Sequence, residues 1–371
     1  MASTMASTMA KPSVSRANSL TPTVRSSVVR SSPVGSGPVR SSPVRSSAVR
    51  STRRSPPVKA GTFTIAFAGD VHFSGRTRTR LDDNPATAFG VAATALAGGD
   101  LTMVNLETAI TTGGEKQNKS FTFSAPPSAL TALRQAGVDV ATEANNHGAD
   151  YGASGLADTL AAIEKSKFPV VGIGPNAARA YAPYTVTVNG ARVAILAASQ
   201  VRDETLQNWT ADDDSAGIAS AYSPRLVEAV KAAKAAGNLV VVYVHWGTEY
   251  TACPDAAQQQ LADTLAAAGA TAVVGTHAHV LQGAGWRKDG VYVAYGLSNY
   301  LWWRSFGNEQ DDAGVLTLSF SGGKVTGSSF AAAHLDDSGV PVPAAGTTKA
   351  RIDAQWERDR QCAGLAATPT G

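Results

Sequence analysis

Histidine, carboxylate and amide side chains of this 371-residue chain occur in an order that could build a metal site. They fall in five short segments: Asp70 and His72, Glu107, the run Asn145-Asn146-His147, His245, and the pair His277 and His279. Imidazole nitrogens with carboxylate and amide oxygens form a mixed ligand set that binds divalent metals. Each segment alone has a simpler explanation, such as a turn or a hydrogen-bonded core histidine. The prediction of a metal site therefore depends on the joint order.

The candidate ligands are more numerous than a single ion requires. Four histidines, two carboxylates and one amide give about four ligands to each of two ions if Glu107 is shared. We therefore expect two divalent ions, and manganese, iron, zinc and magnesium all remain open. Paired ions activate water and stabilise both oxygens of an in-line displacement, so the expected reaction is hydrolysis of a phosphoester or an amide.

His147 is expected to act beside the metals without binding them. An asparagine of the run Asn145-Asn146 just before it is the candidate amide ligand, so the backbone places the imidazole next to the ions. We expect His147 to protonate the leaving group as a general acid. Asp150, three residues later, is expected to orient the ring, as carboxylates around metal sites often do.

The elements that must position these side chains alternate between strands and helices. In chain order, the predicted elements are strand 63–68, helix 85–97, strand 101–105, helix 126–136, strand 138–142, helix 154–165 with Ser154 as N-cap, strands within 186–197, helix 223–236, strand 239–245, helix 254–268 and strand 271–275. Strands without helices follow at 291–295, 315–320 and 324–330. This order predicts a layered α/β fold with mixed sheets. Ligands of such folds bind at the carboxyl ends of strands, where five of the six histidines fall.

The first 60 residues differ sharply in composition from the rest. They hold ten Lys and Arg and no Asp or Glu, which gives this tail a charge of +10 and residues 61–371 a charge of −7. Because the basic charge belongs to a Ser- and Pro-rich tail, which we expect to be disordered, it does not predict nucleic-acid binding by the body. We expect three regions: the tail 1–60, a catalytic domain 61–335 and an extension 336–371 packing on it.

The compartment is left open by the sequence. No apolar run approaches the roughly 18 residues of a membrane helix, so no transmembrane segment is expected, and the tail lacks the apolar stretch of a secretory signal. Cys253 and Cys362, the only cysteines, are expected to form a disulfide, which would favour an extracellular or cell-surface location. Two free thiols in a cytoplasmic protein are the alternative.

Together the motifs resemble the bacterial capsule-synthesis CapA family, also linked to poly-γ-glutamate synthesis, within the calcineurin-like metallophosphoesterase superfamily. The resemblance covers roughly residues 62–335. It rests on the segments Gly69-Asp70-Val71-His72, Asn105-Leu106-Glu107, Ala144-Asn145-Asn146-His147-Gly148-Ala149-Asp150-Tyr151-Gly152, His245-Trp246-Gly247-Thr248-Glu249-Tyr250, Gly275-Thr276-His277-Ala278-His279-Val280-Leu281-Gln282 and Tyr295-Gly296-Leu297-Ser298-Asn299-Tyr300.

The resemblance implies a four-layer α/β/β/α sandwich with the site at its edge. It also implies two ligand sets that share Glu107: Asp70, His72, Glu107 and His279 for one ion, and Glu107, Asn146, His245 and His277 for the other. The superfamily bridges its ions with an aspartate, so the longer Glu107 is a departure. The expected substrate is a small molecule or an anionic polymer. The alternative function is a non-catalytic accessory protein that handles the polymer.

Overall fold

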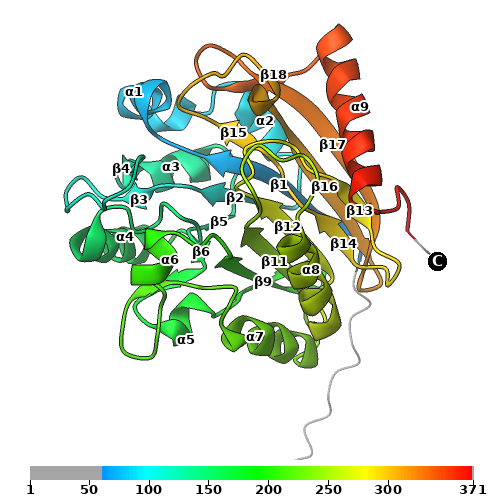
Figure 1. Cartoon of the computed structure of the whole chain (residues 1–371), viewed down its shortest axis with the longest axis horizontal. Coiled ribbons are helices and arrows are strands. Elements are labelled where there is room, and N and C mark those ends of the chain that lie inside the picture. Colours follow the sequence, from blue (N-terminus) through cyan, green and yellow to red (C-terminus); the bar gives the residue numbers. More distant parts are fainter. Residues whose placement is uncertain (1–60, 370–371) are drawn as a thin grey trace, which may run out of the picture. The chain divides into compact units, whose positions relative to one another are not determined.

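Two β-sheets lie face to face in the computed structural model, which describes residues 61–369, and helices cover their outer faces (Figure 1). The predicted disordered tail 1–60 lies outside the described residues. The larger sheet has eight strands. In spatial order they are β18 (Pro341–Pro343), β17 (Lys324–Leu335), β16 (Asp312–Ser321), β1 (Phe63–Val71), β2 (Leu101–Leu106), β5 (Val140–Thr142) and β6 (Val170–Val171), with β15 (Asn299–Leu301) also paired with β1.

The second sheet has six strands, of which the central four run parallel. In spatial order they are β13 (Ala284–Trp286), β14 (Tyr292–Ala294), β12 (Ala272–Thr276), β11 (Leu239–His245), β9 (Ala191–Ser199) and β8 (Tyr184–Val188). Two small sheets pair β3 (Ala109–Ile110) with β4 (Ser124–Ala125), and β7 (Ile173–Gly174) with β10 (Gly217–Ile218). The turn Asn189-Gly190 joins β8 to β9 in a hairpin within the expected strand region 186–197.

Strand β11 shows why the sheets form separate layers. Its side chains alternate: Val241 and Tyr243 pack in the core shared with the larger sheet, whereas Val240 and Val242 pack in the core shared with helices. A strand with apolar residues on both faces must be covered on both sides. The same alternation across the sheets gives the order helices, sheet, sheet, helices, which confirms the predicted four-layer α/β/β/α sandwich.

The helices divide between the two outer faces. The larger sheet is covered by α1 (Gly75–Asp83), α2 (Ala92–Leu96), α3 (Ser128–Gln135) and α4 (Gly152–Ser166), and the smaller sheet by α7 (Pro224–Ala235) and α8 (Ala256–Ala268). Short helices complete the set: η1 (Pro85–Thr87), α5 (Ala177–Ala180), α6 (Glu204–Asn208) and η2 (Glu309–Asp311).

Two sequence predictions about helices are wrong in detail. The single helix expected over 85–97 is divided into η1 and α2, because Gly90 between them adopts a left-handed backbone with φ +52°. Ser154 is not an N-cap, since α4 already begins at Gly152.

The last helix, α9 (Gly346–Cys362), lies along β17 (Figure 1). Trp356 of α9 stacks on Phe330 of β17 with ring centroids 4.0 Å apart. Cys362 at its end forms a disulfide with Cys253, with Cα atoms 5.8 Å apart, so the predicted pairing is confirmed. Within residues 61–369, no helix is both long and apolar enough to cross a membrane.

Candidate metal centre

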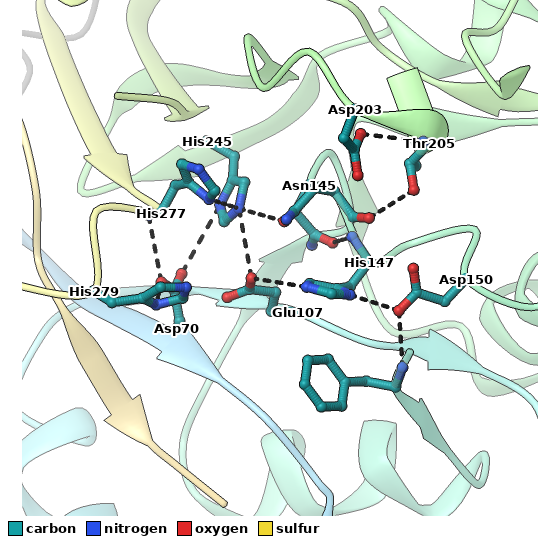
Figure 2. A network of polar contacts seen from close by, with 12 residues as sticks. Asp70, Glu107, Asn145, His147, Asp150, Asp203, Thr205, His245, His277 and His279 are labelled. Atoms are coloured by element: carbon teal, nitrogen blue, oxygen red, sulfur yellow. Dashed lines mark hydrogen bonds and ion pairs between the residues drawn. The ribbon is translucent and has the colours of Figure 1, made fainter. Parts of the chain in front are cut away.

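Side chains from both sheets meet at the carboxyl ends of their strands (Figure 2). The larger sheet contributes Asp70 in β1, Glu107 directly after β2 and Asn146 after β5; the second sheet contributes His245 at the end of β11 and His277 and His279 after β12. Parallel strands bring these segments to one edge although they are up to about 200 residues apart in sequence.

Glu107 lies at the centre of this group and has no hydrogen-bonding partner. Its side chain is fully buried, and neither carboxylate oxygen accepts a hydrogen bond from the described residues. Its Oε1 lies 3.6 Å from His245 Nε2 and 3.9 Å from His147 Nε2. Burial, followed by the charge of Asp70, raises the pKa of Glu107 well above its usual value. An unpaired buried carboxylate is costly, and a bound cation would remove that cost. The donor set therefore fits a divalent metal.

Asp70 is held in place by an amide network. Asn105 Nδ2 donates to Asp70 Oδ1 at 2.8 Å, and Asn145 Nδ2 donates to Asn105 Oδ1 at 2.9 Å. His279 Nδ1 lies 3.6 Å from Asp70 Oδ2. Burial raises the pKa of Asp70, and the neighbouring His279 opposes this shift. The amides thus orient the carboxylate and leave it facing the imidazoles.

The remaining candidate ligands contact one another closely. His245 Nε2 lies 2.8 Å from Asn146 Oδ1 and 3.1 Å from His277 Nδ1. Burial, and then the nearby His277, lower the pKa of His245 well below its usual value, which favours the neutral imidazole that binds metals. Two trios have ligand atoms within 4.8 Å of one another: Asp70, Glu107 and His245, and Glu107, His277 and His279.

His72 lies outside both trios but has free ring nitrogens. Neither nitrogen has a hydrogen-bonding partner among the described residues, and the ring is fully buried. It packs edge-on against Phe123 with centroids 3.9 Å apart, and 5.0 Å from the Trp302 ring. Burial lowers the pKa of His72 well below its usual value. The neutral ring therefore has one nitrogen whose lone pair is available to a metal.

The backbone at this edge adopts unusual conformations. Residues 61–369 contain six non-glycine residues with positive φ, and four of them, Tyr250, His277, His279 and Ser298, lie at or beside the centre. Backbone strain of this kind is typical of functional sites. Gly69 allows the close approach of the loop with Ser298, because a Cβ at position 69 would lie 1.9 Å from the Ser298 carbonyl oxygen.

His147 stands at the side of the centre, between Glu107 and Asp150 (Figure 2). Its Nδ1 lies 2.5 Å from Asp150 Oδ2, so Nε2 is the nitrogen that faces the centre. Burial lowers the pKa of His147. The carboxylate of Asp150 raises it but offsets only part of the effect of burial, so the net shift is downward. Asp150 is itself fixed by the Phe123 N–H at 2.8 Å and by the ammonium of Lys119 at 2.8 Å.

Lys119 is a residue of this site that sequence reasoning missed. It is largely buried and also contacts Asp203 at 2.9 Å and the backbone carbonyl of Asn146. Burial works against its charge, but Asp150 and Asp203 outweigh it and raise the pKa of Lys119. No motif surrounds Lys119, so only the folded structure reveals its place. Asn105, by contrast, belongs to the segment that carries Glu107 and could have been assigned.

Comparison with known proteins places this layered α/β protein in a family. The chain belongs to the family described as "Bacterial capsule synthesis protein PGA_cap", whose model matches residues 64–302. This confirms the resemblance drawn from the motifs.

Individual relatives match part of the chain. It is 34% identical to the capsule biosynthesis protein CapA of Bacillus anthracis over 203 residues, which cover 54% of this chain and 48% of that protein. It is 31% identical to the probable polyglutamine synthesis accessory protein Rv0574c of Mycobacterium tuberculosis over 192 residues, which cover 48% and 50%. The chain thus spans about half the length of the curated relatives it matches.

A solved structure described as a novel phosphatase from Mycoplasma pneumoniae is 14% identical, with a TM-score of 0.46, and covers 75% of this chain and 95% of that one.

Proposed function

We propose that this protein is a metal-dependent hydrolase of phosphoester or amide bonds that acts in capsule or poly-γ-glutamate metabolism. One observation carries the proposal: the fully buried carboxylate of Glu107 has no hydrogen-bonding partner and stands among imidazoles and a second carboxylate. The family description and the name of the Bacillus anthracis relative support the link to capsule synthesis.

The proposed ligand sets share Glu107. Asp70, His72, Glu107 and His279 would hold one divalent ion, and Glu107, Asn146, His245 and His277 the other. Some short distances lie within one set: His279 lies 3.6 Å from Asp70, and His245 lies within 3.1 Å of Asn146 and His277. Each trio described above combines members of both sets, so the division itself follows the family resemblance. Ions bound there would supply an activated water nucleophile at neutral pH and neutralise negative charge that develops on the substrate.

The residues around the ions would supply and orient the proton that the leaving group takes up. With Nδ1 of His147 engaged by Asp150, Nε2 is the atom that would donate a proton to the departing oxygen or nitrogen. Lys119 keeps Asp150 and the Asn146 backbone in place. Buried aromatic rings around His72, including Phe123 and Trp302, would exclude bulk water from this side.

Metal analysis with a matched pair of variants tests this proposal. Wild-type protein should contain divalent metal and should hydrolyse an aryl phosphodiester or a γ-glutamyl amide in the presence of Mn²⁺. Glu107→Gln should lose both metal and turnover. Glu143→Gln is the matched control, because Glu143 is also fully buried without a partner but belongs to neither ligand set. Full metal content in Glu107→Gln would contradict the bridging role.

A second function, non-catalytic handling of the polymer, is favoured by the name of the Mycobacterium tuberculosis relative, an accessory protein. In that case the ions would bind carboxylates of the polymer and no bond would break. Metal-dependent binding of γ-glutamyl oligomers without turnover on any phosphoester or amide would select this alternative. A disulfide within the described residues supports an extracellular or cell-surface location for either function.

A further inference from the structure

A narrow cavity of about 70 Å³ opens beside the candidate metal centre, and an arginine lines it. His147 and His279 of the candidate centre line it, together with Arg304, Glu249 and several aromatic side chains. A volume of this size exceeds the roughly 10–15 Å³ that one water molecule needs, so a small polar group can enter it. A substrate group that occupies this cavity therefore lies close to Arg304.

Arg304 is surrounded by aromatic rings and has no ionic partner. Its guanidinium carbon lies 4.5 Å from the ring centre of Phe306, 4.8 Å from that of Trp303 and 5.7 Å from that of Phe121. Its Nε is buried without a hydrogen-bonding partner, and no residue of the described part of the chain forms an ion pair with it. Rings stabilise the cation through their faces and accept none of its five N–H groups in conventional hydrogen bonds. Those donors therefore remain available to a ligand.

The loop that carries Arg304 is fixed by a buried carboxylate. Asp311 accepts hydrogen bonds from the Phe306 N–H at 3.0 Å, the Gly307 N–H at 2.6 Å and the Ser305 hydroxyl at 2.8 Å. Because the loop is held in this way, Arg304 is positioned at the cavity before a ligand arrives. Positioning in advance lowers the entropy cost of binding.

We infer that Arg304 binds a second anionic group of the substrate, a carboxylate or a phosphate, while the reacting group lies at the metal centre. The inference rests on the proposed function, because the metal centre has to hold the reacting group. Planar guanidinium groups match both kinds of anion through paired N–H donors. Glu249 also lines the cavity, but its carboxylate interacts with the Tyr250 hydroxyl and forms no ion pair with Arg304 in the structure described. The substrate class is therefore one with two neighbouring negative charges.

Calorimetric titration of the Mn²⁺-loaded protein tests this inference with three probes. Glutarate carries two carboxylates, 3-phosphonopropionate carries a carboxylate and a phosphonate, and acetate carries a single charge. Wild-type protein should bind at least one dianion more tightly than acetate. Arg304→Gln should weaken the binding of that dianion by about 10- to 100-fold, the range for hydrogen bonds to a charged group. The affinity for acetate should fall by less than about threefold.

Two further variants serve as controls. Arg304→Lys keeps the charge but not the planar fork, and should recover part of the affinity. Arg134→Gln removes another arginine that lies over a ring, 5.4 Å from the centre of Phe168, and should bind like wild type. Metal content, measured by elemental analysis, should be equal in all four proteins.

The outcomes separate this inference from the proposed hydrolysis. Equal dianion affinity in wild type and Arg304→Gln, or no preference of the wild type for a dianion, overturns the role of Arg304 even if the protein hydrolyses esters. Loss of dianion affinity in a protein that hydrolyses no ester or amide supports Arg304 and rejects the hydrolase instead. Loss of metal in Arg304→Gln would show that the residue supports the fold of the centre, which also overturns the inference.

Discussion

At the scale of single residues, two glutamates are equally buried but differ in the groups around them. Glu107 and Glu143 are both fully buried with unpartnered oxygens. Glu107 is surrounded by imidazoles that can share a cation with it, whereas the pKa of Glu143 is raised by burial alone. Burial therefore marks a functional carboxylate only when other ligands converge on it.

Glu143 should make the stability of the protein fall as the pH rises. Its folded pKa lies above the unfolded value of 4.5, so the folded chain binds more protons and the free energy of unfolding decreases above about pH 4.5. Glu143→Gln cannot ionise and should be more stable than wild type at pH 8, by about 1–3 kcal/mol. The difference should shrink toward pH 4. Urea unfolding of both metal-free proteins at several pH values measures this, and parallel curves would contradict it.

His147 should affect turnover but not metal content. His147→Ala removes the proposed proton donor and should lower turnover by about 10²–10⁴-fold on substrates with poor leaving groups. The loss should be smaller for nitrophenyl esters, since nitrophenolate departs without a proton. Steady-state kinetics and elemental analysis measure both effects. An empty metal site in His147→Ala would instead make His147 a ligand.

At the scale of elements, the site depends on close contacts between strands that only glycine permits. At Gly275, in β12, a Cβ would lie 2.0 Å from Trp246 Nε1 and 2.4 Å from the Tyr295 carbonyl oxygen. Trp246 Nε1 donates to that carbonyl at 2.7 Å. The hydrogen bond joins the segment after β11 to the segment after β14, immediately beside the two histidines that follow β12.

Gly275→Ala should therefore destabilise the protein and disturb the centre. We expect a loss of about 1–3 kcal/mol or more from overpacking, together with weaker metal binding. Gly113→Ala is the control, because a Cβ at position 113 has no heavy atom within 4 Å. Urea midpoints and metal content should change for position 275 and stay near wild type for position 113. Equal midpoints for both variants would show that β12 adjusts without cost.

Most elements near the site could be predicted from sequence, and their exact limits could not. Asp70, Glu107 and His245 lie in or directly after the apolar runs that form β1, β2 and β11, and such runs are a strong local signal. The break of the 85–97 helix depends on the backbone of Gly90, which no periodicity reveals. Lys119 could not be assigned, because its partners Asp150 and Asp203 become neighbours only after folding.

At the scale of the whole described chain, one covalent bond joins distant parts. The disulfide between Cys253 and Cys362 ties the end of α9 to the loop that follows β11 and spans 109 residues. His245 ends that same strand, so the bond also restrains the region beside the candidate centre.

Removal of this disulfide should cost stability. The double variant Cys253→Ser and Cys362→Ser should lose up to about 4–5 kcal/mol of unfolding free energy in the chain-entropy model. Chemical denaturation under non-reducing conditions compares it with wild type. Two titratable thiols in denatured wild-type protein made in an oxidising compartment would show that the bond does not form.

The division of the ligand set between two sheets has a consequence for synthesis of the chain. Asp70, Glu107 and Asn146 emerge from the ribosome long before His245, His277 and His279. The trio Asp70, Glu107 and His245 is complete only after β11 has been translated. The trio Glu107, His277 and His279 is complete only after the turn that follows β12. An ion captured by a complete trio therefore arrives after most of the domain has been made. Metal binding would then occur late in synthesis, when the chain is nearly complete.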